Sequence, residues 1–304
     1  MRPGIHLSAI AYELGDPVAI GTLDDPEVAE RLHALGSDGF RRCRVAGASA
    51  AALGAASARR TLERCGGPEP AAVVFSTEST RLVSATQNTW ELLRAVPLPR
   101  TSTLTVGGNG CGNLAPALRA ARDLVLAEDA DSVLLTLADR FTLGTRYQPV
   151  GNTVMSDSAV SCLITPAPLG AGFQLLAMAT AVNADLLPET RKLLGARTVM
   201  RAIGRALDEI NSRVQQPERG FDWFVTGNYD RSTRRFLASA VQMDDSRAQA
   251  PNIAEYGHCY AADQLITLAT LERSGALRHG QRLLLLATSA RAWSLIALEY
   301  SELG

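Results

Sequence analysis

Apolar and polar positions along the 304 residues follow two periods, one typical of strands and one typical of helices. Residues 4–14 alternate like a strand, and residues 71–79 and 132–140 are short apolar runs that end in small or charged polar residues. Residues 48–66 form an alanine-rich run that stops at a glycine, as helices commonly do. This alternation predicts an α/β fold with helices layered on a sheet.

The rest of the chain continues the same scheme, with the weakest signal between residues 141 and 194. We expect further helices at residues 86–96, 111–130, 197–214, 232–242 and 264–277. We expect further strands at residues 101–106, 158–165, 173–182, 221–228, 282–289 and 294–300.

Two long stretches share one plan. Residues 111–139 and residues 257–288 each begin with a glycine-containing turn, continue as a helix and end in an apolar strand. The strand-like residues 71–79 likewise pair with residues 221–230. We therefore expect two pseudo-repeated halves, 1–165 and 166–304, whose helix-start turns meet at a pseudo-twofold axis.

Composition narrows the function classes. The net charge of −1 supplies no field that attracts nucleic acid or a membrane surface. The five cysteines are odd in number and lack metal-site spacing, so we expect a reduced, cytoplasmic protein without metal or bound cofactor. Glu13 and Asp16 interrupt the early apolar run, and no run approaches the ~18 residues of a membrane helix, so we expect neither signal peptide nor membrane span.

One cysteine has the setting of a nucleophile. Cys111 lies among four glycines in the stretch GGNGCGN, at the expected start of a helix. A helix N-terminus favours the thiolate, and its unpaired N–H groups can bind an oxyanion. A nucleophilic cysteine also needs a base. Of the four histidines, only His258 lies in a comparable turn, YGHCYAAD, at the start of the matching helix.

Two other interpretations of this stretch remain open. Gly110, Gly112 and Ala115 fit the G-x-G-x-x-A turn of dinucleotide-binding proteins, with Asp139 as a late ribose-binding acid. Alternatively, Cys111 is a small, inert residue that fills a tight bend.

Five segments, in the same order along the chain, resemble the thiolase superfamily and most closely its β-ketoacyl-ACP synthase III branch. They are SDGFRRCRVA (37–46), VGGNGCGNLAPALRAA (106–121), VMSDSAVSCLIT (154–165), FDWFVTGNYDRSTRRFLASAV (221–241) and the ending from residue 255 to residue 300. The resemblance implies a thiolase-like fold with α/β/α/β/α layers, and Cys111 at the position of the family nucleophile.

The resemblance also exposes departures from the family's Cys-His-Asn site. The family histidine falls at Gly227, next to Asn228, and the family asparagine falls at His258. We therefore expect Cys111 as nucleophile, His258 as base and Asn228 as an orienting or carbonyl-binding group. The family's final glycine-rich turn is replaced by a Thr-Ser-Ala sequence, in which the backbone N–H of Ser289 is expected to complete an oxyanion hole with that of Cys111.

The implied function is acyl transfer. The resemblance points to an acyltransferase that loads an acyl group from acyl-CoA or an acyl-carrier protein onto Cys111 and passes it to a small carbon, oxygen or nitrogen nucleophile, in polyketide, fatty-acid or other specialised biosynthesis. Arg42, Arg44 and Arg231 are expected to meet the substrate's phosphates or the carrier, and Leu82 to floor the acyl pocket of a dimer partner. A homodimer is expected, with a heterodimer possible. The alternative is a degenerate subunit that pairs with an active ketosynthase.

Overall fold

The computed structural model describes residues 4–66, 69–80, 83–127, 130–186 and 192–302. Ten strands form one mixed sheet in the order β12-β11-β13-β14-β10-β1-β9-β6-β4-β5. The first half supplies β1 (His6–Leu14), β4 (Ala72–Ser76), β5 (Ser102–Val106), β6 (Val133–Asp139) and β9 (Ser158–Thr165). The second half supplies β10 (Gly172–Val182), β11 (Trp223–Val225), β12 (Ala248–Gln249), β13 (Arg282–Thr288) and β14 (Ala292–Ser301).

The two sets of strands repeat one topology. In the first set β4 runs parallel to both β5 and β6, β6 is antiparallel to β9, and β9 is antiparallel to β1. In the second, β11 runs parallel to both β12 and β13, β13 is antiparallel to β14, and β14 is antiparallel to β10. A short antiparallel pairing of β1 with β10 joins the two sets. The two sets of strands therefore share the same order and the same relative strand directions.

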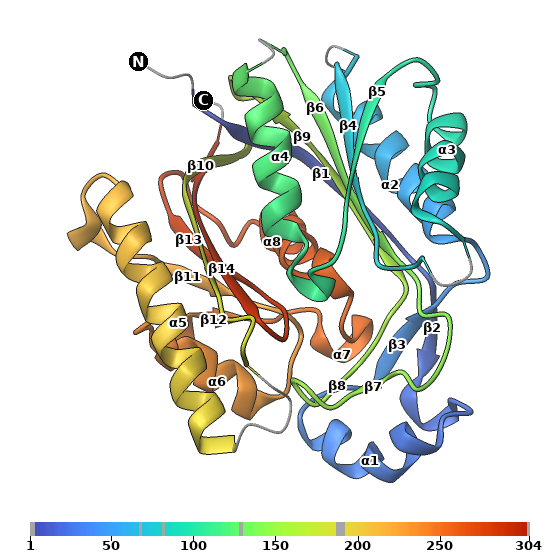
Figure 1. Cartoon of the computed structure of the whole chain (residues 1–304), viewed down its shortest axis with the longest axis vertical. Coiled ribbons are helices and arrows are strands. Elements are labelled where there is room, and N and C mark those ends of the chain that lie inside the picture. Colours follow the sequence, from blue (N-terminus) through green and yellow to red (C-terminus); the bar gives the residue numbers. More distant parts are fainter. Residues whose placement is uncertain (1–3, 67–68, 81–82, 128–129, 187–191, 303–304) are drawn as a thin grey trace.

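Helices complete five layers. The two central helices, α4 (Leu114–Ala127) and α8 (Asp263–Arg273), lie between the two sets of strands (Figure 1). Helices α2 (Ala50–Cys65) and α3 (Ala85–Ala95) cover the outer face of the first set, and α5 (Lys192–Arg213) and α6 (Arg231–Ala240) cover that of the second. The α/β/α/β/α layering follows the expectation from the sequence.

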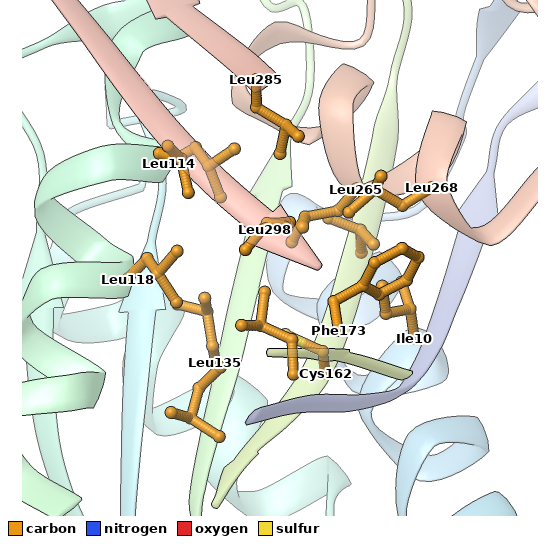
Figure 2. Packing of buried hydrophobic residues seen from close by; sticks show 14 of the residues in the cluster. Ile10, Leu114, Leu118, Leu135, Cys162, Phe173, Leu265, Leu268, Leu285 and Leu298 are labelled. Atoms are coloured by element: carbon orange, nitrogen blue, oxygen red, sulfur yellow. The ribbon is translucent and has the colours of Figure 1, made fainter. Parts of the chain in front are cut away.

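The central helices are held by the largest apolar core. Leu114 and Leu118 of α4 and Leu265 of α8 are fully buried with Leu285 and Leu298 from the second set of strands (Figure 2). Two further buried clusters pack α2 and α3, and α5 and α6, against the outer faces of the strands. The inner strands β6, β9 and β13 are therefore buried on both faces, which explains why their segments read as continuous apolar runs.

The two central helices begin differently from the outer ones. Ser49, Ser84 and Asp230 cap α2, α3 and α6 with side-chain hydrogen bonds. Before α4 and α8 the chain instead forms a 3₁₀ turn, at Gly110–Gly112 and Tyr260–Ala262. Each turn starts with a left-handed residue at φ +52° to +53°, Gly110 in one half and Tyr260 in the other.

Some elements were not predicted. They are the helices α1 (Pro26–Ser37) and α7 (Ile253–Tyr256), the edge strand β12, the antiparallel pair of β2 (Asp16–Ala19) with β3 (Arg42–Val45), and the short pair of β7 (Tyr147–Gln148) with β8 (Thr153–Val154). Except for α1, each is only two to four residues long, too short for a periodic signal. Within the described ranges, no helix is both long and apolar enough to cross a membrane.

Candidate active site

The turns before α4 and α8 bring a thiol and an imidazole together. Cys111 Sγ lies 3.1 Å from His258 Nε2. Cys111 lies in the 3₁₀ turn, three residues before α4, and not in the first turn of the helix as the sequence suggested. His258 is almost fully buried, whereas the Cys111 residue is partly exposed. The thiol is therefore open to a substrate while its basic partner is shielded.

Asp263 completes a chain of three side chains. Its Oδ2 contacts His258 Nδ1, on the side of the ring opposite Cys111. The carboxylate is fully buried and also accepts hydrogen bonds from the backbone N–H groups of Cys259 at 2.8 Å and Asn228 at 2.7 Å. A carboxylate so held fixes the tautomer and orientation of the imidazole, as the acid of a nucleophile-histidine-acid triad does.

Sequence reasoning missed Asp263, although a signal was present. Asp263 is the first residue of α8 and lies five residues after His258. In the first half, the equivalent helix α4 starts directly after Asn113. An acidic residue at the start of a buried helix beside a candidate base is the pattern that could have identified it.

The electrostatics favour a protonated imidazole. Burial alone would lower the pKa of His258, but the negative charges of Cys111 and Asp263, with their hydrogen bonds, outweigh it and raise this pKa to about 10. At neutral pH the His258 ring is therefore protonated, and its Nε2 can donate a hydrogen bond to Cys111 Sγ.

Asn228 serves the acid and does not face the thiol. Its Nδ2 donates to the carbonyl of Gly257 at 2.7 Å and to Asp263 Oδ1 at 3.2 Å. Both side-chain N–H groups are thereby used, and none is left for a substrate carbonyl. Of the two roles expected for Asn228, the geometry supports the orienting one.

A second carboxylate holds the nucleophile loop. Glu78 Oε1 accepts from the backbone N–H groups of Gly108 at 2.7 Å and Gly110 at 3.1 Å, and from Asn113 Nδ2 at 2.6 Å. Asn113 Oδ1 accepts in turn from the N–H of Asn109 at 3.0 Å. The successive N–H groups of the glycine-rich loop thus form an anion-binding concavity that Glu78 fills. The sequence interpretation did not single out Glu78.

The predicted second oxyanion donor is wrong in this geometry. The backbone N–H of Ser289 donates to the carbonyl of Ala292 at 2.8 Å, which closes the turn between β13 and β14. The Ser289 hydroxyl also accepts from the N–H of Ala292 at 3.1 Å. A glycine-rich turn has no side chain that could make this second bond, so the Ser289 hydroxyl gives the turn a contact that the family's turn lacks. The N–H of Cys111 makes no hydrogen bond within the described part of the chain.

The arginines expected to bind substrate lie in three different settings. Arg44 donates from Nε to the carbonyl of Glu255 at 2.8 Å and lies over the ring of Tyr256, so it braces the segment leading to His258. Arg42 pairs with the Glu255 carboxylate at 2.9 Å on the surface. Arg231 is exposed at the start of α6. Leu82 lies outside the described residues.

The buried position of Asp139 contradicts the dinucleotide-binding interpretation. Asp139 is buried and accepts from the N–H of Glu78 at 2.6 Å and from the hydroxyl of Thr77 at 3.3 Å, so it has no exposure to a ribose. Among the residues with described positions, no group of three or more histidine, cysteine or acidic side chains is arranged to hold a metal ion.

Comparisons with known proteins agree with this architecture. Residues 215–295 match the family described as 3-oxoacyl-[acyl-carrier-protein (ACP)] synthase III C terminal. Among curated proteins, no sequence matches the chain. Among solved structures, FabH, the 3-oxoacyl-(acyl carrier protein) synthase III of Pseudomonas aeruginosa, superposes with a TM-score of 0.80 at 18% identity, covering 99% of each chain.

Two other similar structures come from different enzymes. The acyltransferase ChlB3 superposes with a TM-score of 0.79 at 18% identity, over 99% of this chain and 98% of ChlB3. The priming β-ketosynthase of the R1128 polyketide pathway has a TM-score of 0.78 at 16% identity and covers 99% and 97%. The dinucleotide-binding interpretation is therefore replaced. The chain is a thiolase-fold protein similar to the 3-oxoacyl-[acyl-carrier-protein] synthases III.

Proposed function

We propose that this protein is an acyltransferase of the β-ketoacyl synthase III type, which captures an acyl group on Cys111 from acyl-CoA or an acyl-carrier protein. The observation that carries the proposal is the contact chain from Cys111 through His258 to Asp263. It joins a partly exposed nucleophile to a buried base and an orienting acid, which is the minimum that thioester exchange requires.

The loading step needs only these groups. The Cys111 thiolate attacks the thioester carbonyl carbon, and the carbonyl oxygen becomes an oxyanion that accepts from the N–H of Cys111. When the intermediate collapses, the bond from carbon to the CoA sulfur breaks. The His258 imidazolium gives its Nε2 proton to the departing thiolate, which leaves an acyl-cysteine and a free thiol. The acceptor then attacks the carbonyl carbon of the acyl-cysteine while neutral His258 takes the acceptor's proton. The bond from that carbon to Cys111 Sγ breaks, which restores the Cys111 thiolate and the His258 imidazolium.

Acyl transfer is favoured over decarboxylative condensation. The family uses two polar side chains above one carbonyl to stabilise an enolate, and the first of those positions is Gly227 here. The neighbouring Asn228 commits both side-chain N–H groups to Gly257 and Asp263. The acceptor that we propose is therefore a preformed oxygen, nitrogen or carbon nucleophile, as in the tailoring of a specialised metabolite.

A homodimer remains our prediction for the assembly. Among the residues that the structure describes, the outermost strand β5 pairs only with β4, and four of its five residues are exposed, including Leu104 at 43%. The neighbouring helix α3 exposes Trp90 at 56%. An exposed edge strand with apolar side chains favours pairing with a second strand, and a second copy of β5 would extend the sheet. The carrier-protein or CoA partner, a heterodimer and a cytoplasmic location likewise stay predictions.

Intact-mass spectrometry tests the proposal. The purified full-length chain is incubated with acetyl-, butyryl- and octanoyl-CoA, and we expect one acyl adduct that is absent from Cys111→Ala. His258→Ala should slow adduct formation by about 10²–10⁴-fold. No adduct on the native chain, or the same adduct on Cys111→Ala, contradicts the proposal. Unchanged product formation by His258→Ala in a complex with another ketosynthase would instead support a degenerate partner subunit.

A further inference from the structure

The expected oxyanion hole lacks its second backbone donor, and the side chain of Tyr229 lies beside it. Because Ser289 donates its N–H to Ala292, the N–H of Cys111 is left as the one backbone donor expected from the sequence. Oxyanion holes combine several donors, and each one is worth about 10²–10³ in rate. A second donor is therefore the missing part of the described site.

The hydroxyl of Tyr229 lies at this turn. Tyr229 Oη is 2.9 Å from Thr288 Oγ1, and Thr288 directly precedes Ser289. The turn itself contacts the nucleophile segment, because the backbone of Thr288 and Ser289 lies 3.3 Å from the position that a Cβ on Gly112 would take. The Tyr229 ring also packs at a tilt against that of His258, with 5.0 Å between the ring centroids. The phenol is thus enclosed by the neighbours of Cys111.

The Tyr229 ring occupies space that side chains at two glycine positions would otherwise fill. A Cβ on Gly227 would lie 2.6 Å from Cζ and 2.8 Å from Oη of Tyr229, and a Cβ on Gly151 would lie 2.3 Å from Cδ1. No side chain fits at either position while the ring is in place. The family histidine at position 227 is therefore replaced in space by a tyrosine from two residues further along the chain.

The chemistry of this phenol suits a donor. Burial and the negative charge of Cys111 raise the pKa of Tyr229 far above its ordinary value, so the hydroxyl keeps its proton. Thr288 is its one hydrogen-bond partner among the described residues and can donate to Oη. The phenol O–H then stays free to point toward a bound carbonyl.

From this geometry, and resting on the acyltransferase function proposed above, we infer that the Tyr229 hydroxyl is the second donor to the thioester carbonyl. As the thiolate of Cys111 adds to the carbonyl carbon, the developing oxyanion accepts from the N–H of Cys111 and the O–H of Tyr229. No proton leaves Tyr229, and the leaving thiolate takes its proton from His258. Tyr229 thereby favours acyl transfer in two ways. Its hydroxyl supplies a hydrogen-bond donor for the oxyanion, and its ring excludes a side chain at position 227.

Two reactions of the same cysteine test this inference. Acyl loading from acetyl-, butyryl- or octanoyl-CoA forms an oxyanion, whereas alkylation by iodoacetamide needs the thiolate but forms none. In Tyr229→Phe we expect loading to slow by about 10²–10³-fold, with alkylation and melting temperature unchanged. The matched control is Tyr260→Phe, whose ring stacks on His258 at 6.4 Å and which should leave both rates near those of the native chain.

Each outcome decides the matter. Native loading rates in Tyr229→Phe overturn the inference, as does an equal slowing of alkylation, which indicates a structural role. An equal loss of loading in Tyr260→Phe also overturns the assignment to Tyr229. Thr288→Val removes only the partner hydroxyl and should slow loading much less than Tyr229→Phe. Failure of the native chain to form any adduct is a different result, since it rejects the proposed function itself.

Discussion

The turns before α4 and α8 have the same hydrogen-bond pattern but support different catalytic groups. In each turn a polar residue near the helix start accepts from the backbone N–H four residues earlier, Asn113 from Asn109 at 3.0 Å and Asp263 from Cys259 at 2.8 Å. In each half that residue also bonds to a residue that follows the equivalent parallel strand, β4 in the first half and β11 in the second. The partner is Glu78 for Asn113 and Asn228 for Asp263.

The carboxylate and the amide have exchanged places between the halves. In the first half the acid is on the strand side, and Glu78 gathers backbone N–H groups around the nucleophile loop. In the second half the acid is on the helix side, where Asp263 contacts His258. One framework thus fixes the position of a nucleophile in one copy and the protonation state of a base in the other.

The largest expected effect comes from Asp263→Asn. An amide next to His258 Nδ1 no longer favours the tautomer and charge that Cys111 needs, so we expect both alkylation and acyl loading to fall by about 10³–10⁴-fold. Alkylation by iodoacetamide, quenched at set times and analysed by mass spectrometry, measures the loss in rate. The control in the other half is Asn113→Ala, which leaves the contacts of His258 intact and should cost far less. Equal losses in the two variants would contradict the division of roles.

The charge of His258 can be followed directly. Because its pKa is raised to about 10, the ring should stay protonated through neutral pH. Relative to an unfolded value of about 6.5, the stabilisation from this proton is complete below about pH 6.5 and is lost as the pH rises through about 10.

Cys111→Ser removes the negative sulfur and should lower the pKa of His258, and adding Asp263→Asn should lower it further. Titration of the imidazole Cε1–H signal by NMR measures both changes. The other three histidines of the chain serve as internal references. A His258 signal that titrates near pH 6.5 in the native chain would show that the ion pair is absent.

The comparison of halves also shows what the sequence could reveal. The contact of Cys111 with His258 was foreseeable, because the repeat of strand, helix and turn brings two helix starts together regardless of residue identity. The alternation of strands and helices predicted α/β layers, and the resemblance to the thiolase superfamily implied their number. Ser289 was misjudged because the sequence does not show where a backbone N–H points. Glu78 was missed because it acts through backbone atoms, for which a glycine-rich stretch gives no partner.

The nucleophile loop gives the next effect in size. Glu78→Ala leaves the N–H groups of Gly108 and Gly110 without their acceptor, at a cost of about 1–3 kcal/mol in the free energy of unfolding. A displaced Cys111 should then load acyl groups about 10–100-fold more slowly. Glu78→Gln keeps an acceptor oxygen and should restore most of both losses. Thermal unfolding and loading rates measure them, and a Glu78→Ala chain indistinguishable from the native one would rule out the brace.

The smallest effect is expected at Asn228, because its backbone does part of the work. Asn228→Ala removes the side-chain bonds to Gly257 and Asp263, but the backbone N–H still donates to Asp263 at 2.7 Å. Loss of about 1 kcal/mol of orienting energy corresponds to a roughly fivefold fall in alkylation and loading. Asn228→Asp places a second carboxylate against Asp263 and should do more harm than alanine. If alanine proved as damaging as Asp263→Asn, Asn228 would have to act on the reacting atoms themselves, which its two committed N–H groups do not permit.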